Sequence, residues 1–143
     1  MKKLLVVAAL ALSAAACSPG AGSTWEKSYG KTFYEPNAGM AAVYIIRDDP
    51  GQDTSPISIV NGQSPVGSLA GFTWMRLDLP PAPYDLRAFG TQGSTELIIT
   101  VNAGQSRFFL AEPKPPGNAQ LREITQDEGR RLVRKGQAVA ASP

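Results

Sequence analysis

The chain has 143 residues, of which 43% are hydrophobic and 18% are charged, and its 14 lysine and arginine residues nearly balance 12 acidic ones. It contains no histidine and one cysteine, which excludes Ser-His-Asp triads, Cys-His dyads and the usual zinc sites. The charge balance gives no support for nucleic-acid binding, which depends on an excess of positive charge.

The beginning of the chain has the order of a secretory signal peptide. Two lysines follow the initiating methionine, residues 4–12 are an apolar run, and small residues lead to Cys17. This order resembles that of bacterial lipoproteins, in which the chain is cleaved before a cysteine that carries lipid. The segment is shorter than the roughly 20 residues of a membrane-spanning helix. We therefore predict a signal peptide over residues 1–16 and a lipid on Cys17; an ordinary signal peptide cut near Ala16, which would leave a free thiol, stays open.

The predicted lipid defines where the mature protein resides. Cleavage before Cys17 removes two lysines and leaves 12 basic and 12 acidic residues, so overall charge does not favour attachment to anionic lipid. Several acyl chains on one cysteine anchor a protein without any further helix. Ser18 follows the cysteine, and in Gram-negative lipoproteins a residue other than aspartate there implies the outer membrane. We expect a protein anchored in the cell envelope that faces the periplasm in such a host.

Residues 17–38 combine the lipidated cysteine, a flexible tether and an aromatic arm. The tether, residues 18–24, is rich in Gly, Ser and Pro. In the arm, Trp25, Tyr29 and Phe33 follow one another at a spacing of four. The sequence favours packing of this arm against the domain's own surface. Docking to a partner or to the membrane interface is the alternative.

From residue 40 onward the hydrophobic pattern has a period of two, which is typical of strands. An Asn-Gly pair at 61–62 predicts a tight hairpin, and Pro65 predicts that the returning strand lies at a sheet edge. A turn at 102–104 predicts that the last two strands form a second hairpin. The predicted strands are residues 40–47, 57–60, 65–69, 72–79, 84–88, 95–101 and 106–111. This spacing predicts an all-β fold, an antiparallel β-sandwich of about seven strands, within residues 39–136.

One helix is expected at the end of this domain. Thr125 is a suitable N-cap, Glu128 completes a capping box, and Gly136 ends the helix. Its apolar stripe is narrow, so we expect it to gain stability by lying on the sandwich. Residues 137–143 are predicted to be a disordered tail.

A candidate binding face lies on the strand predicted over residues 72–79. Phe72, Trp74 and Arg76 share its outward side. Such a face resembles an aromatic platform for a sugar ring or a peptide. Large aromatic residues also cover the open side of a sandwich beneath a helix, and packing of Trp74 under the terminal helix is the favoured interpretation.

Other chemistry-bearing patterns are weak. Residues 28–31 fit S-x-x-K, but the companion motifs of penicillin-recognising enzymes are missing. Asp48, Asp49 and Asp53 do not have EF-hand spacing and are interpreted as turn formers. The basic residues at 130–135 could touch lipid phosphates, although a solvated helix end is the favoured interpretation. We predict no catalytic residue, no cofactor and no metal site.

Three motifs in order resemble a family of small bacterial lipoproteins with an uncharacterised module, a domain of unknown function (DUF 2846-like). They are an AVYIIR strand at 42–47, LPP at 79–81 and AGQSRFF at 103–109, and residues 121–131 resemble the family's strand and helix at the end. Ala82 stands where members commonly have glycine. The resemblance implies a compact β-sandwich and an envelope location, with no catalytic residues to transfer.

Together these patterns favour a lipid-anchored envelope protein whose sandwich is a non-enzymatic structural or protein-interaction module. A ligand-binding module for cell-wall glycan or a small envelope molecule, using Phe72, Trp74 and Arg76, is the alternative. An enzyme is the least favoured class. The expected partners are the membrane, through Cys17, and an envelope protein or the cell wall, with no nucleic acid.

Overall fold

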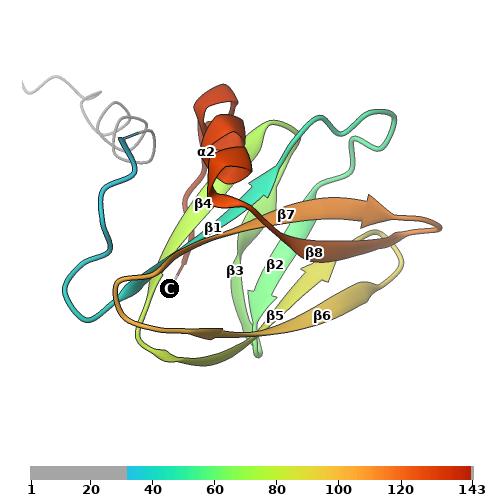
Figure 1. The fold of residues 1–143 in the computed structure, drawn as a ribbon. Coiled ribbons are helices and arrows are strands. Elements are labelled where there is room, and N and C mark those ends of the chain that lie inside the picture. The colour runs from blue at the N-terminus through green and yellow to red at the C-terminus, as the bar shows by residue number, and fades with distance from the viewer. Residues whose placement is uncertain (1–31, 143) are drawn as a thin grey trace, which may run out of the picture.

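The computed structural model describes residues 32–142, which form two packed β-sheets and one covering helix (Figure 1). The helix, α2, spans Gln126–Lys135. The strands are β1 (Ala41–Arg47), β2 (Ile57–Asn61), β3 (Ser64–Leu69), β4 (Thr73–Leu79), β5 (Ala82–Phe89), β6 (Ser94–Val101), β7 (Ser106–Lys114), β8 (Asn118–Ile124) and β9 (Gln137–Ala138). The predicted signal peptide, Cys17 and the tether lie outside the described residues.

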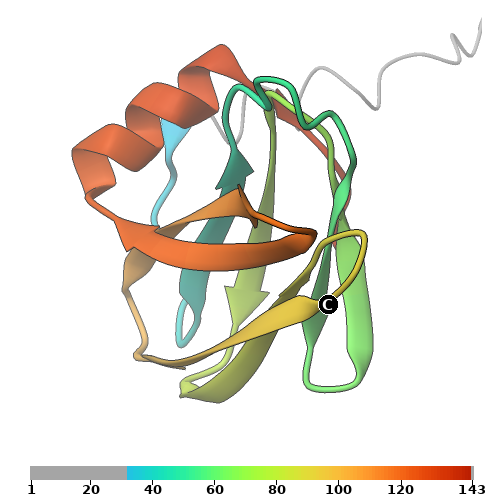
Figure 2. The same cartoon turned by 90° about the vertical axis from the view of Figure 1, so that its right-hand side faces the viewer.

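The two sheets confirm the all-β sandwich. One sheet has five strands in the order β8-β7-β1-β4-β9, and the other has four in the order β3-β2-β5-β6. All seven predicted strand segments are present, and Figure 2 shows the sheets with α2 across the outer side of the larger one. The described residues contain nine strands rather than about seven, because β8 pairs with β7 and the short β9 pairs with β4.

The sequence predicted an antiparallel sandwich, but two of the strand pairs are parallel. Strand β1 runs parallel to β7, and β4 runs parallel to β9. The predicted hairpin between β6 and β7 is therefore wrong: β6 belongs to the smaller sheet and β7 to the larger one. The turn at Gly104 instead leads β7 alongside the start of β1, where Gly104 N donates to Met40 O at 2.8 Å and Ala42 N donates to Gln105 O at 2.8 Å.

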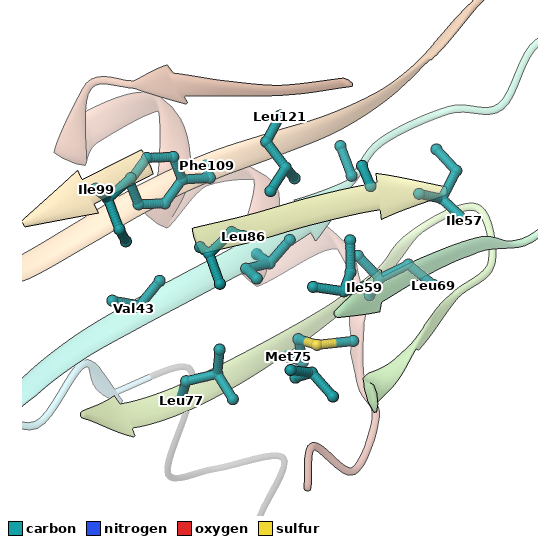
Figure 3. Close-up of a cluster of buried hydrophobic side chains, with 14 of the residues drawn as sticks. Val43, Ile57, Ile59, Leu69, Met75, Leu77, Leu86, Ile99, Phe109 and Leu121 are labelled. Atoms are coloured by element: carbon teal, nitrogen blue, oxygen red, sulfur yellow. The ribbon is translucent and has the colours of Figure 1, made fainter. Parts of the chain in front are cut away.

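Alternation along the strands places one set of side chains between the sheets, as the period of two predicted. Met75, Leu77 and Leu79 of β4 belong to this main core. Figure 3 shows Met75 and Leu77 together with Leu86 of β5 and Ile99 of β6. Strand β1 is buried along its whole length. One of its faces packs into the main core and the other beneath α2, so β1 is enclosed on both sides.

The terminal helix forms as predicted. Thr125 Oγ1 accepts a hydrogen bond from Glu128 N at 3.2 Å, and Gly136 N donates to Leu132 O at 3.1 Å. Acidic residues occupy its first turn and basic residues its last, which matches the helix dipole. Among the described residues no helix is long and apolar enough to span a bilayer.

The tail predicted to be disordered is attached to the sandwich in the structure. Gln137 N donates to Phe72 O and Val139 N to Trp74 O, both at 2.9 Å. Ser142 N donates to the carbonyl oxygen of Val66 in β3 at 2.8 Å. Val139 and Ala141 pack against the main core, so the tail connects the edges of the two sheets. Backbone pairing and this burial hold a segment whose own sequence has little preference for a strand.

Candidate functional site

The residues predicted as a binding face do not form an open platform. Trp74 is only 3% exposed and lies beneath α2 in a second cluster with Leu132 and Val133. Its ring centroid is 6.1 Å from that of Tyr44. A ring enclosed in this way has no free face for a sugar or a peptide, so the structure contradicts the platform and supports the favoured packing interpretation.

Arg76 is held by side chains of the domain itself. It forms an ion pair with Asp78, with 2.8 Å between Nη2 and Oδ1, and its own side chain is 6% exposed. Its Nη1 also donates to the Tyr44 hydroxyl at 3.1 Å and to the Tyr34 carbonyl at 3.3 Å. Arg76 therefore joins the larger sheet to the beginning of the described chain.

Phe72 stands apart from the other two residues. It lies in the turn before β4, is 47% exposed and adopts a left-handed backbone conformation with φ of 57°. Its carbonyl oxygen accepts the hydrogen bond from Gln137 immediately after α2. The structure therefore places Phe72 beside the end of the helix and Trp74 beneath the helix, while Arg76 is paired with Asp78.

The part of the aromatic arm that the structure describes packs on the domain, as the sequence favoured. Phe33 contacts the stacked pair formed by Tyr44 and Phe108, whose ring centroids are 4.7 Å apart at 6°. The guanidinium groups of Arg130 and Arg134 lie over the Phe33 ring. The arm and α2 together cover the outer side of the larger sheet. Trp25 and residues 28–31 lie outside the described residues.

A polar groove lies at the carboxyl end of β1, beside β7 and β8 of the larger sheet (Figure 1 shows these strands). Its volume is about 440 Å³, and a second groove of about 290 Å³ adjoins it at Pro113. The first groove is lined by Arg47, Asp48, Asp49, Leu110, Ala111, Glu112, Pro113 and Gln120. This size is within the range of small-molecule sites, although such sites are usually more apolar.

Arg47, the last residue of β1, is one of the residues that line this groove. It is 2% exposed, and its guanidinium donates to the carbonyl oxygens of Ser55, Leu69 and Asp53. Burial lowers the pKa of Arg47 from its ordinary value, and the charge of Asp53 opposes this change. These bonds fix the loop between β1 and β2, so Arg47 has a structural role that its position at a strand end did not reveal.

Asp49 and Asp53 of that loop act as turn formers, as predicted. Gly51 N donates to Asp49 Oδ1 at 2.9 Å, and Ser55 N donates to Asp53 Oδ1 at 3.0 Å. Within the part of the chain that the structure describes, no group of three acidic or cysteine side chains could hold a metal ion.

The outer face of the smaller sheet is the second candidate surface. Ile98 of β6 is 67% exposed and Phe89 of β5 is 38% exposed. Between them Arg87 pairs with Asp85 at 2.8 Å and with Glu96 at 3.6 Å. The hydrogen bond and charge of Asp85 raise the pKa of Arg87. The sequence analysis did not identify this face. The sequence does contain a signal for it, because Ile98 alternates with the core residues of the same strand and must therefore point outward.

A further ion pair joins β7 to β8 beside the main core. Arg107 donates to both carboxylate oxygens of Glu123, at 2.8 and 2.7 Å, and its Nη1 donates to Thr100 O at 2.7 Å. These hydrogen bonds hold the pKa of Glu123 below its ordinary value, and partial burial opposes the shift. Arg107 therefore connects β8, at one edge of the larger sheet, to β6, at the edge of the smaller sheet.

Comparison with known proteins leaves the family unassigned. No protein-family model matches the chain, and no curated protein matches it. The resemblance to small envelope lipoproteins therefore stays a prediction from the motifs at 42–47, 79–81 and 103–109.

Proposed function

We propose that this chain is a lipid-anchored protein of the cell envelope whose β-sandwich is a non-enzymatic protein-interaction module. The order of residues 1–17 supports the anchor, and the contrast between the two outer sheet faces supports the module. One face is covered by α2 and the arm. The other presents Ile98, 67% exposed, on β6, which pairs along its length with β5.

The arrangement around Ile98 is suited to a protein partner. Isolated exposed apolar residues are common on any surface, so Ile98 alone would carry little weight. Here the charges of Asp85, Arg87 and Glu96 are paired with one another beside the apolar side chains. Protein interfaces combine apolar anchors with a polar surround in this way, and preformed ion pairs reduce the cost of ordering side chains on binding.

In-cell photocrosslinking tests this proposal. A photoreactive amino acid is placed at Ile98 and, as a matched control on another exposed site, at Lys114 at the tip of the β7–β8 hairpin. We expect a discrete crosslinked protein from position 98 that is absent from position 114. Repeated recovery of no protein from position 98, or of the same set from both positions, contradicts the proposal.

A single substitution distinguishes a contact from loss of folding. Ile98→Lys places a charge on the exposed face opposite Asp85 and, because the side chain is mostly in water and faces a carboxylate, should leave the thermal midpoint almost unchanged. We expect it to remove the product crosslinked from a photoreactive group at Thr100, which follows Ile98 on the same face.

The loop-end groove supports a second candidate function, binding of a wall glycan fragment or another small envelope molecule. Carboxylates and the Gln120 amide line it, and such groups bind polyols and amides. Calorimetric titration of the mature protein with wall fragments tests this candidate, with Asp49→Asn as the variant that should weaken binding. No heat of binding for the wild type, or equal binding by the variant, counts against this groove.

A further inference from the structure

Positive charge is concentrated on the second half of α2. Arg130, Arg131, Arg134 and Lys135 stand within its last six residues. Elsewhere in the described residues acidic side chains outnumber basic ones. Charge is therefore distributed unevenly over the domain. We call the four basic side chains of α2, on the helix that covers the larger sheet, the basic pole.

These four cations differ from most others in their partners. Arg76, Arg87, Arg107 and Arg122 each form an ion pair with a carboxylate of a strand. None of the four cations of α2 forms an ion pair with a carboxylate among residues 32–142. Dipole matching accounts for charges at the last turn, but it does not require the charges to remain without carboxylate partners.

The basic pole lies where the chain comes from the predicted anchor. The guanidinium carbons of Arg130 and Arg134 are 5.2 and 5.3 Å from the ring centroid of Phe33, near the start of the described chain. Figure 2 shows that start, in light blue, beside α2. Residues 18–31 separate Cys17 from Thr32, and a fully extended chain of that length reaches at most about 50 Å.

We propose that the exposed basic side chains of α2, Arg131, Arg134 and Lys135, bind the phosphate groups of anionic phospholipids in the membrane that holds the anchor. This inference rests on the proposed lipidation of Cys17, because the lipid keeps the basic pole within a short distance of the bilayer and so at a high effective concentration. Basic side chains next to an anionic membrane surface are attracted to it electrostatically.

Two exposed aromatic residues strengthen the choice of a membrane over an acidic protein. Tyr34, 55% exposed, follows Phe33 in the arm, and Phe72, 47% exposed, lies beside the end of α2. Aromatic side chains at the margin of a basic surface are typical of groups that enter the headgroup region. Docking by α2 would direct the opposite sheet, with Ile98, away from the membrane and toward a partner.

Quenching by labelled lipids tests the orientation. The lipidated protein is extracted from cells and placed in nanodiscs of phosphatidylcholine, with or without phosphatidylglycerol, that contain a lipid with a nitroxide headgroup. A fluorophore is attached at Gln137→Cys beside α2 or, as control, at Ile98→Cys on the other sheet. With phosphatidylglycerol we expect quenching at 137 to exceed that at 98 by about twofold or more, and to weaken with added salt.

Charge-removing variants provide the matched comparison. Arg131→Gln with Lys135→Gln should reduce the difference between the two labels by at least half, whereas Arg122→Gln with Lys114→Gln removes the same charge elsewhere and should preserve it. Equal quenching at 137 and 98, or a difference that loss of Arg131 and Lys135 leaves unchanged, overturns the inference while leaving the anchor intact. A protein without acyl groups on Cys17 overturns both the anchor and this orientation.

Discussion

Gly129 shows how closely α2 approaches the sheet, and its replacement by alanine gives the most informative test of that packing. A Cβ atom at this position would lie 2.3 Å from Phe108 Cδ1 and 2.4 Å from Phe108 Cγ. Real Cβ contacts are not this short, so either the ring or the helix must move. Phe108 is 2% exposed and stacks on Tyr44, which leaves the ring little room to withdraw.

Two effects of Gly129→Ala oppose each other. Alanine in a helix interior is favoured over glycine by about 1 kcal/mol. Extra volume in a packed core costs about 1–3 kcal/mol, and the short contact to Phe108 places this site in the upper part of that range. We expect a net loss of about 1–2 kcal/mol in the free energy of unfolding, and each kcal/mol lowers the midpoint of a domain near this size by about 4–8 °C.

Urea and thermal unfolding monitored by circular dichroism measure this loss, with Arg131→Ala on the exposed side of α2 as the control. In a Phe108→Ala background the obstructing ring atoms are gone, so Gly129→Ala should become neutral or stabilising. If Gly129→Ala is neutral or stabilising in the wild type, α2 does not pack on Phe108 as described. The claim that α2 covers the outer side of the larger sheet would then be wrong.

Three further outcomes follow from the same structure. Deleting residues 137–143 should lower the thermal midpoint by several degrees because the β9 hydrogen bonds and the burial of Val139 are lost, whereas a disordered tail would make the deletion silent. Because Arg107 depresses the pKa of Glu123, the pair stabilises the fold above the unfolded carboxyl pKa of about 4.3, and this contribution disappears as pH falls through the lower folded value. Glu123→Gln should therefore lower the midpoint at pH 7 and have a much smaller effect near pH 2; an equal effect at both pH values would refute the assignment. In a Trp25→Phe background, emission from Trp74 should be blue-shifted, resist acrylamide quenching and stay unchanged on addition of wall fragments, and strong quenching would show that the ring is accessible.

Periodicity predicted which residues face the core but not which strands are neighbours. The alternation of Met75, Leu77 and Leu79 located one side of β4 correctly, because a period of two depends only on the backbone of that strand. The Asn61-Gly62 turn also predicted the right hairpin, since its left-handed glycine is specific for a tight reversal. The turn at Gly104 has a similar signature, yet it joins two sheets.

The remaining features depend on contacts between distant segments. Strand β9 has only two residues. It pairs in parallel with Thr73 and Trp74 because it follows α2, and the end of α2 lies beside β4. Arg47 resembles an ordinary charged residue at a strand end, and only the fold brings three carbonyl oxygens to its guanidinium. The burial of Trp74 was the favoured prediction because the helix needed an apolar surface to cover.

The central claim is that this domain works from a lipid anchor at Cys17, and mass spectrometry of the N-terminal peptide tests it most directly. Protein extracted from the membranes of producing cells should yield a first residue of Cys17 whose mass is raised by a thioether-linked diacylglycerol and an amide-linked acyl chain. An unmodified Cys17, or a chain that begins at another residue, would contradict the claim.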